Sequence, residues 1–207
     1  MSKYIELVHA FNINPPKRTI YLFNHSGNSD ENPGIDFRQA QTFLRNMDLL
    51  EQKSNDPIVV QMYSTGGEWY AGISIYDRII TSDCEVTVIA HGHATSMSSI
   101  ILQAADHRIM MPNAHFLAHY GSEGFEGDFL NCRNYMKHAE NICQDMISIY
   151  AKRVINGPLF KEAGTTIEIV KSHLEDKMKN GDWYLTPEEA KQWGFIDEIF
   201  EITKKYE

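Results

Sequence analysis

The chain has 207 residues, of which 43% are hydrophobic and 23% are charged, a balance typical of a globular protein with one core. Its net charge of −9 argues against a nucleic-acid-binding protein, and its apolar runs are too short to span a membrane. Three cysteines without a CxxC pair predict reduced thiols in the cytoplasm, with no disulfide framework and no zinc site. We therefore expect one domain, residues 1–207, in a cytoplasmic protein that binds neither nucleic acid nor a membrane.

Predicted strands and helices alternate in the first half of the chain. Short apolar runs predict strands at residues 19–23, 57–63 and 85–90. Apolar residues at helical spacing predict helices at residues 37–50, capped by Asp36, and around residues 73–80. The polar residues 25–34 predict a surface loop. This alternation is typical of the α/β class.

The second half contains one unusually long helical pattern. A helix at residues 96–105 and strands at 108–111 and 115–119 come first. Residues from about 128 to 154 then carry apolar side chains at gaps of three and four, which predicts an amphipathic helix about 40 Å long. Such a helix either overhangs the core slightly or packs on another subunit. Thr186 begins a capping box, Gly194 ends that short helix, and residues 195–200 predict a final strand.

Three predicted strand ends carry residues that could act together: Gly67, Ser96 and His119. The ends of neighbouring strands in a layered α/β fold can meet in one cleft. A serine becomes a nucleophile when a histidine takes its proton, and that histidine needs a carboxylate to orient it. The backbone N–H groups of Gly67 and Met97 could stabilise an oxyanion. Serine is also a common helix cap, so the segment GHATSMSS at residues 92–99 does not by itself identify a nucleophile.

Four segments, taken in order, carry a family resemblance. STGG at residues 64–67 is followed by AGISIYD at 71–77, and GHATSM occupies residues 92–97. MPN at residues 111–113 leads to His119, and DWYLTPEEA occupies residues 182–190. These segments resemble the SPGG-AGxSIYD, GxAASM, LPN…H and D-x-x-[LM]-[ST]-x-x-EA motifs of the ClpP-like serine peptidases. The resemblance runs from about Thr19 to Phe200.

The resemblance implies a role for each of five residues. Ser96 corresponds to the nucleophile, His119 to the general base and acid, and Asp182 to the orienting carboxylate. Gly67 and Met97 correspond to the oxyanion-hole donors. No metal and no cofactor are implied. Extended peptide substrate is expected to pair with a strand edge near residues 121–125.

The resemblance also implies a fold and a biological role. The fold is a ClpP/crotonase-type spiral of ββα units, with residues 128–154 as a protruding handle helix. The implied activity is that of a serine endopeptidase in a homo-oligomer of stacked heptameric rings, which degrades unfolded protein. Because the sequence has no GxxxxGK phosphate loop, energy would come from a separate ATP-driven AAA+ unfoldase. The alternatives are a processing peptidase, for example in phage capsid maturation, a non-catalytic structural subunit, and a crotonase-like acyl-CoA enzyme.

Several other residues compete with this assignment. Ser98 and Ser99 are interpreted as ordinary helix residues. His91 and His93 form an HxH pair without an evident third metal ligand, and His115 is too far along a strand from His119 to share an ion. The possible rivals of Asp182 are interpreted as solvated or capping groups; they are Asp106, Glu123, Glu126 and Asp128.

Overall fold

The computed structural model describes residues 3–23, 34–122, 124–162 and 164–202. Most of the predicted loop at 25–34, and the rival carboxylate Glu123, lie outside these residues. The mixed α/β class and the long helix are both confirmed. No helix in the described part of the chain is long and apolar enough to cross a membrane.

A largely parallel sheet forms the centre of the fold. Its strand order is β1-β2-β3-β4-β5-β8, and all neighbours from β2 onward are parallel. β6 pairs with the far end of β4 and then with the antiparallel β7. The strand bounds are β1 Ile13–Asn14, β2 Thr19–Phe23, β3 Ile58–Ser64, β4 Val86–Thr95, β5 His107–Met110, β6 His115–Ala118, β7 Trp183–Leu185 and β8 Glu198–Ile199.

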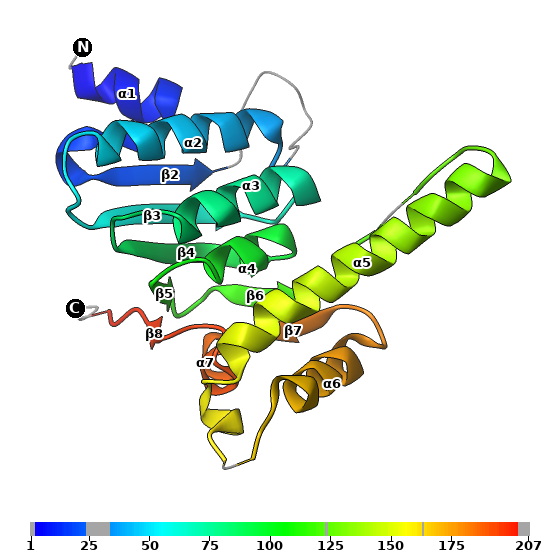
Figure 1. Ribbon diagram of the computed structural model, residues 1–207. Helices are drawn as coiled ribbons and strands as arrows, with labels where there is room; N and C mark the ends of the chain where they lie inside the picture. Colours follow the sequence, from blue (N-terminus) through cyan, green and yellow to red (C-terminus); the bar gives the residue numbers. More distant parts are fainter. Residues whose placement is uncertain (1–2, 24–33, 123, 163, 203–207) are drawn as a thin grey trace.

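Helices cover one face of this sheet. α2, α3 and α4 lie side by side against β2, β3 and β4 (Figure 1). Alternate strand residues, such as Val60 and Val88, are fully buried beneath them, which follows from the two-residue repeat of a strand. The helix bounds are α1 Lys3–Phe11, α2 Phe37–Glu51, α3 Trp69–Ile80, α4 Met97–Leu102, α5 Phe129–Val154, α6 Ile167–Met178 and α7 Pro187–Trp193.

The predicted end of the strand at residue 90 is wrong, because β4 continues to Thr95. Gly92 lies within the strand at a φ of 64°, where the register between β3 and β4 shifts. A side chain there would place its Cβ 2.9 Å from the Tyr63 ring. The glycine therefore marks an irregularity in pairing and not a turn, and it lets β4 run on to deliver Ser96.

The predicted final strand is also shorter than expected, since only Glu198–Ile199 pairs in the sheet. Phe195 is fully buried and stacks on Phe116, with the ring centroids 4.5 Å apart. Its aromatic contacts place Phe195 in the core beneath the sheet edge instead of along it. Its backbone N–H donates to the Ala190 carbonyl of α7, so this residue belongs to the end of that helix and not to a strand.

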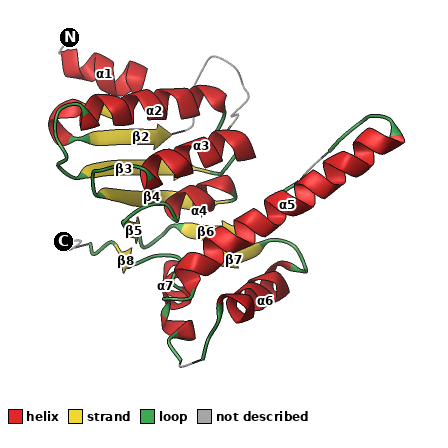
Figure 2. Ribbon diagram, viewed as in Figure 1, coloured by secondary structure: helices red, strands yellow, loops and turns green. Residues whose placement is uncertain are grey.

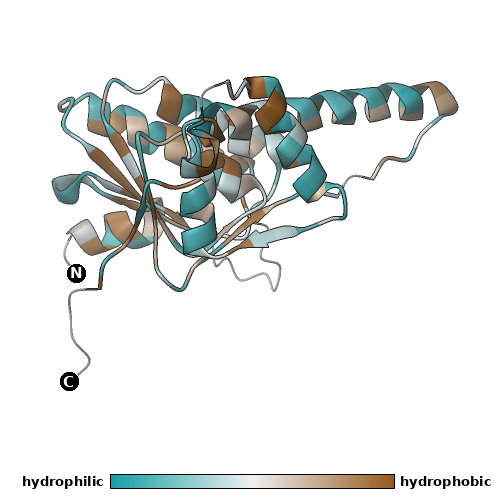
Figure 3. Cartoon of the chain, turned by 90° about the horizontal axis from the view of Figure 1, so that it is seen from below, coloured by the Kyte–Doolittle hydropathy of each residue, from teal (hydrophilic) through white to brown (hydrophobic). Residues whose placement is uncertain are grey.

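The long helix α5 has a packed half and a projecting half (Figure 2). Buried residues occur only from Met146 to Val154, while Phe129 and Met136 are 76% and 58% exposed. Figure 3 shows the projecting half as mainly hydrophilic, with hydrophobic residues at its far end. The predicted overhang is therefore real, although Phe125 stacks on Tyr135 and Tyr70 stacks on His138 in this half of the helix.

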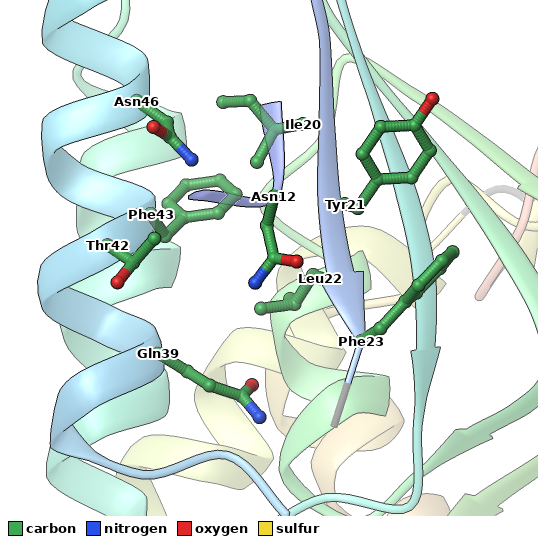
Figure 4. Close-up of a pocket in the computed structure, with 9 residues that line it drawn as sticks. All are labelled: Asn12, Ile20, Tyr21, Leu22, Phe23, Gln39, Thr42, Phe43 and Asn46. Carbon is green, nitrogen blue, oxygen red and sulfur yellow. The ribbon is translucent and has the colours of Figure 1, made fainter. Parts of the chain in front are cut away.

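A small gap between α2 and β2 holds amide side chains (Figure 4). Asn46 donates to the Phe11 carbonyl at 2.7 Å, and Gln39 donates to the Gly34 carbonyl at 2.9 Å. The gap measures about 10 Å³, which is room for one water molecule at most. Asn46 therefore ties the end of α1 to α2, Gln39 ties the residue before Ile35 to α2, and the gap is too small for a ligand site.

An ion pair between a buried arginine and a partly exposed aspartate ties β5 to the C-terminal segment. Arg108 is 7% exposed, and its Nε donates to Asp197 Oδ2 at 2.9 Å. Burial alone would raise the pKa of Asp197, but its hydrogen bonds and charge contact with Arg108 outweigh burial and lower it. The stability from this carboxylate is therefore present above its unfolded-state pKa and is lost as pH falls through its lower folded-state pKa.

Asp197→Asn is expected to lower the free energy of unfolding by about 2–3 kcal/mol, because it leaves the Arg108 guanidinium buried with a weaker partner. This loss is smaller than the loss expected when a fully buried ion pair is broken, because 34% of the Asp197 side chain is exposed. Urea unfolding at neutral pH measures it. Asp48→Asn is the matched control, because Arg78 keeps its bond to Glu51. Equal losses in both variants would contradict this account.

Candidate active site

Ser96 lies at a sharp junction between β4 and α4. Its φ is 55° and its ψ is −129°, in a region that non-glycine residues rarely adopt and that often marks functional sites. Its N–H donates to the Leu117 carbonyl at 3.0 Å, which fixes the junction against β6. Gly66 lies directly behind it, where an added Cβ would come within 2.6 Å of the Ser96 Cβ. The backbone therefore holds this hydroxyl in one direction.

His119 and Asp182 are brought together by the pairing of β6 with β7. The register sets Ala118 opposite Trp183, so the residues just beyond, His119 and Asp182, face each other across the strand ends. His119 Nδ1 lies 3.0 Å from Asp182 Oδ1, and His119 Nε2 lies 2.8 Å from Ser96 Oγ. The three side chains thus form one hydrogen-bonded row. The carboxylate end is open to solvent, since 52% of the Asp182 side chain is exposed.

The backbone N–H groups of Gly67 and Met97 are both available beside Ser96. The bridge between Ile35 and the glycine pair uses the Gly66 carbonyl and the Glu68 N–H, and leaves the Gly67 N–H unused. Met97 is the first residue of α4, so its N–H has no acceptor within the helix. Both residues line the same cavity as the Ser96 hydroxyl.

This cavity has mainly apolar walls and a volume of about 330 Å³. Trp69 from α3, Ile100 from α4 and Met146 from α5 form part of the lining. A second, more open hollow of about 620 Å³ follows α5 outward and shares Tyr120 and Gly121 with the first. A ligand at Ser96 could therefore place one apolar group in the cavity and continue along the helix.

The neighbouring serines have structural surroundings. Ser98 is fully buried, and its Oγ donates to the Ser64 carbonyl at 2.8 Å while it accepts from the Thr95 N–H at 2.9 Å. Ser99 Oγ lies 2.7 Å from the Tyr150 hydroxyl. Both lie in α4 as predicted, but the sequence did not indicate that their hydroxyls join α4 to β3 and α5.

The described rivals of Asp182 are occupied elsewhere. Asp106 accepts from the Val86 N–H at 2.8 Å, and Asp128 caps α5 by accepting from the Leu130 and Asn131 N–H groups. Glu126 is exposed. Of the described acids, only Asp182 hydrogen-bonds to His119.

The histidine pair has separate environments. His91 Nε2 hydrogen-bonds to the Gln61 side chain, and burial lowers the pKa of His91. The His93 ring packs against the Tyr63 ring. Among the described residues, no three histidine, cysteine or acidic side chains gather closely enough to hold a metal ion.

The arrangement contains the parts that acyl transfer requires. A hydroxyl contacts an imidazole nitrogen, a carboxylate contacts the other nitrogen, and two N–H groups flank the hydroxyl in an apolar cavity. The five residues proposed from the sequence therefore lie close together in the structure; they are Gly67, Ser96, Met97, His119 and Asp182. Trp69 is a lining residue that sequence reasoning missed, although its place two residues after the glycine pair could have suggested it.

Comparison with known proteins finds a family match and a similar protein. A family model described as Clp protease matches residues 31–203. The chain is also similar to the ATP-dependent Clp protease proteolytic subunit of Deinococcus radiodurans. The two sequences are 29% identical over 175 residues, which cover 83% of this chain and 78% of the relative.

Proposed function

Because the chain belongs to the Clp protease family, we propose that it is a serine endopeptidase whose nucleophile is Ser96. The observation that carries the proposal is the hydrogen-bonded row from Ser96 Oγ through His119 to Asp182 Oδ1, with contacts of 2.8 and 3.0 Å. The family alone would fit a non-catalytic subunit as well. A serine held in a strained conformation against a histidine favours catalysis.

In the proposed mechanism, His119 Nε2 takes the hydroxyl proton as Ser96 Oγ attacks the peptide carbonyl carbon. Asp182 holds Nδ1–H and stabilises the imidazolium that forms. The Gly67 and Met97 N–H groups donate to the oxyanion. His119 then returns the proton to the leaving amine, which departs. Water, deprotonated by the same imidazole, attacks the acyl-enzyme and releases the acid.

The substrate in this proposal is an extended peptide segment. The apolar cavity receives the side chain next to the cleaved bond, and the hollow along α5 accommodates further residues of the chain. Pairing of the substrate backbone near residues 121–125 stays a prediction from the sequence, because the described residues of this segment belong to no strand. A long open groove favours cleavage within a peptide over hydrolysis of a small acyl ester.

Labelling with a fluorophosphonate tests the assignment of the nucleophile. The reagent phosphonylates a serine whose proton is taken by a neighbouring base, so we expect one adduct, on Ser96. Peptide mapping by mass spectrometry identifies the site. His119→Ala should abolish labelling, whereas His173→Ala, in an exposed part of α6, should leave it intact. Absence of an adduct on the folded wild-type chain would favour a non-catalytic subunit.

We also propose a homo-oligomer of stacked rings in the cytoplasm that works with a separate ATP-driven unfoldase. Supporting this are the exposed apolar residues of the projecting half of α5, among them Phe129 and Leu130. The relative from Deinococcus is named as an ATP-dependent subunit, which supports the need for an ATPase partner.

Multi-angle light scattering should find a particle of several subunits at micromolar concentration. Replacing Phe129 and Leu130 with serine should reduce its mass, since both side chains are more than half exposed and contribute little to the fold of one chain. Serine replacement of the exposed Ile5 and Phe11 in α1 serves as the control. A wild-type monomer would remove the ring proposal but not the assignment of Ser96.

A further inference from the structure

A separate cavity lies at the C-terminal end of α5, away from the candidate active site. It measures about 300 Å³ and shares no lining residue with the cavity at Ser96. Its lining comes from the end of α5 and the segment after it, from α7 and from the residues just before β8, and Figure 1 shows where these elements lie in the fold. Its lining residues include Arg108, Arg153, Asn156, Lys161, Lys191 and Asp197.

The charges in this cavity are strongly unbalanced. Four cationic side chains line it, against one carboxylate, in a chain whose net charge is −9. The carboxylate is already occupied, because both oxygens of Asp197 accept from Arg108. Lys161 and Lys191 make no ion pair with any described residue. Arg108 is therefore neutralised by Asp197, whereas Arg153, Lys161 and Lys191 form no ion pair among the described residues, although the charge of Asp106 also acts on Arg153.

Arg153 faces the cavity from the last turn of α5. Its Nε donates to the Gln103 carbonyl at 2.6 Å, and its Nη2 donates to the Ala105 carbonyl at 2.9 Å. Burial, and next the Arg108 guanidinium, lower the pKa of Arg153. The helix-end carbonyls offset part of its charge, but they are dipoles and do not neutralise it. An arginine remains protonated in such a place, so an anion in the cavity would be attracted to its charge.

We propose that this cavity is a binding site for a phosphate-class oxyanion. A guanidinium presents paired N–H donors that match the oxygens of a phosphoryl group, and lysines add point charges around it. The wall is formed in part by Arg108, which is more than nine-tenths buried and held in place by Gln103 Oε1 and the Gly194 carbonyl. A doubly charged ion suits three unpaired cations better than chloride does. The volume admits a free phosphate or a small phosphomonoester.

Isothermal titration calorimetry with inorganic phosphate, at constant ionic strength and against chloride, tests the site. We expect saturable binding of one phosphate per chain. The double variant Lys161→Gln/Lys191→Gln should weaken it at least tenfold, since the loss of one charge-assisted hydrogen bond has about that effect. Both lysines are exposed, so the variant should fold normally. The double variant Lys17→Gln/Lys53→Gln changes the net charge equally at exposed positions outside the cavity and should bind as wild type.

A second titration identifies the source of the phosphoryl group. Glycerol phosphate that binds as tightly as inorganic phosphate supports a phosphomonoester group as the ligand. Binding of inorganic phosphate alone supports the free ion. No heat of binding for either probe would overturn the proposal. So would equal phosphate affinity in the two double variants, because the effect would then be general charge screening. Neither result depends on peptidase activity, so the proposed function stands or fails separately.

Discussion

Replacement of Ser96 by alanine is expected to lower kcat for a small peptide by about a millionfold, the loss that accompanies removal of a triad serine elsewhere. Within the described part of the chain the hydroxyl hydrogen-bonds only to His119, so the change removes the attacking oxygen and little else. Melting temperature should be unchanged. Steady-state kinetics on a fluorogenic peptide, with circular dichroism as a check on folding, measures both quantities.

Two further serines separate the chemistry from the structure. Ser74→Ala removes an exposed hydroxyl whose one hydrogen bond to a described residue is with the Tyr70 carbonyl of its own helix, so activity should stay at the wild-type level. Ser98→Ala removes a buried hydroxyl that serves both the Thr95 N–H and the Ser64 carbonyl. It should lower stability by about 1–3 kcal/mol while the surviving folded enzyme still cleaves peptide. A fully active Ser96→Ala variant would show that the nucleophile is misassigned.

The sequence was informative where periodicity or a motif is local. The apolar spacing of α5 and the capping box at Thr186 are present in the structure as predicted. α6 was missed although Val170, Leu174 and Met178 recur at helical spacing and are buried. Charged residues between them obscured that pattern. The length of β4 was underestimated because Gly92 resembles a turn residue, and only the pairing with β3 shows that the strand continues.

The site was predictable as a set of residue types but not as a geometry. Motif order pointed to Ser96, His119 and Asp182, yet their distances depend on the register of β6 with β7, which no local pattern sets. Similarly, the cationic cavity unites residues from β5, α5 and α7 that are scattered over more than 80 positions of the sequence. Charge clusters of this kind exist only after folding.

Replacement of Asp182 by asparagine carries the second-largest expected effect, a loss in kcat of about a hundredfold to ten-thousandfold. The amide keeps the shape but can present N–H to His119 Nδ1, which favours the wrong tautomer and no longer stabilises the imidazolium. Asp182 is partly exposed, so water screens its charge, and we expect the loss in kcat to lie near the hundredfold limit of this range.

The test separates a change in chemistry from a change in structure. KM and melting temperature should remain at the wild-type values while kcat falls, since Asp182 orients His119 and does not contact the substrate. The control is Asp176→Asn, which removes the same charge from an exposed carboxylate paired with Lys179 in α6. It should leave kcat unchanged. Equal kcat values for the two variants would show that Asp182 is not the orienting carboxylate, and Glu126 would be tested next because Asp106 and Asp128 accept from backbone N–H groups elsewhere.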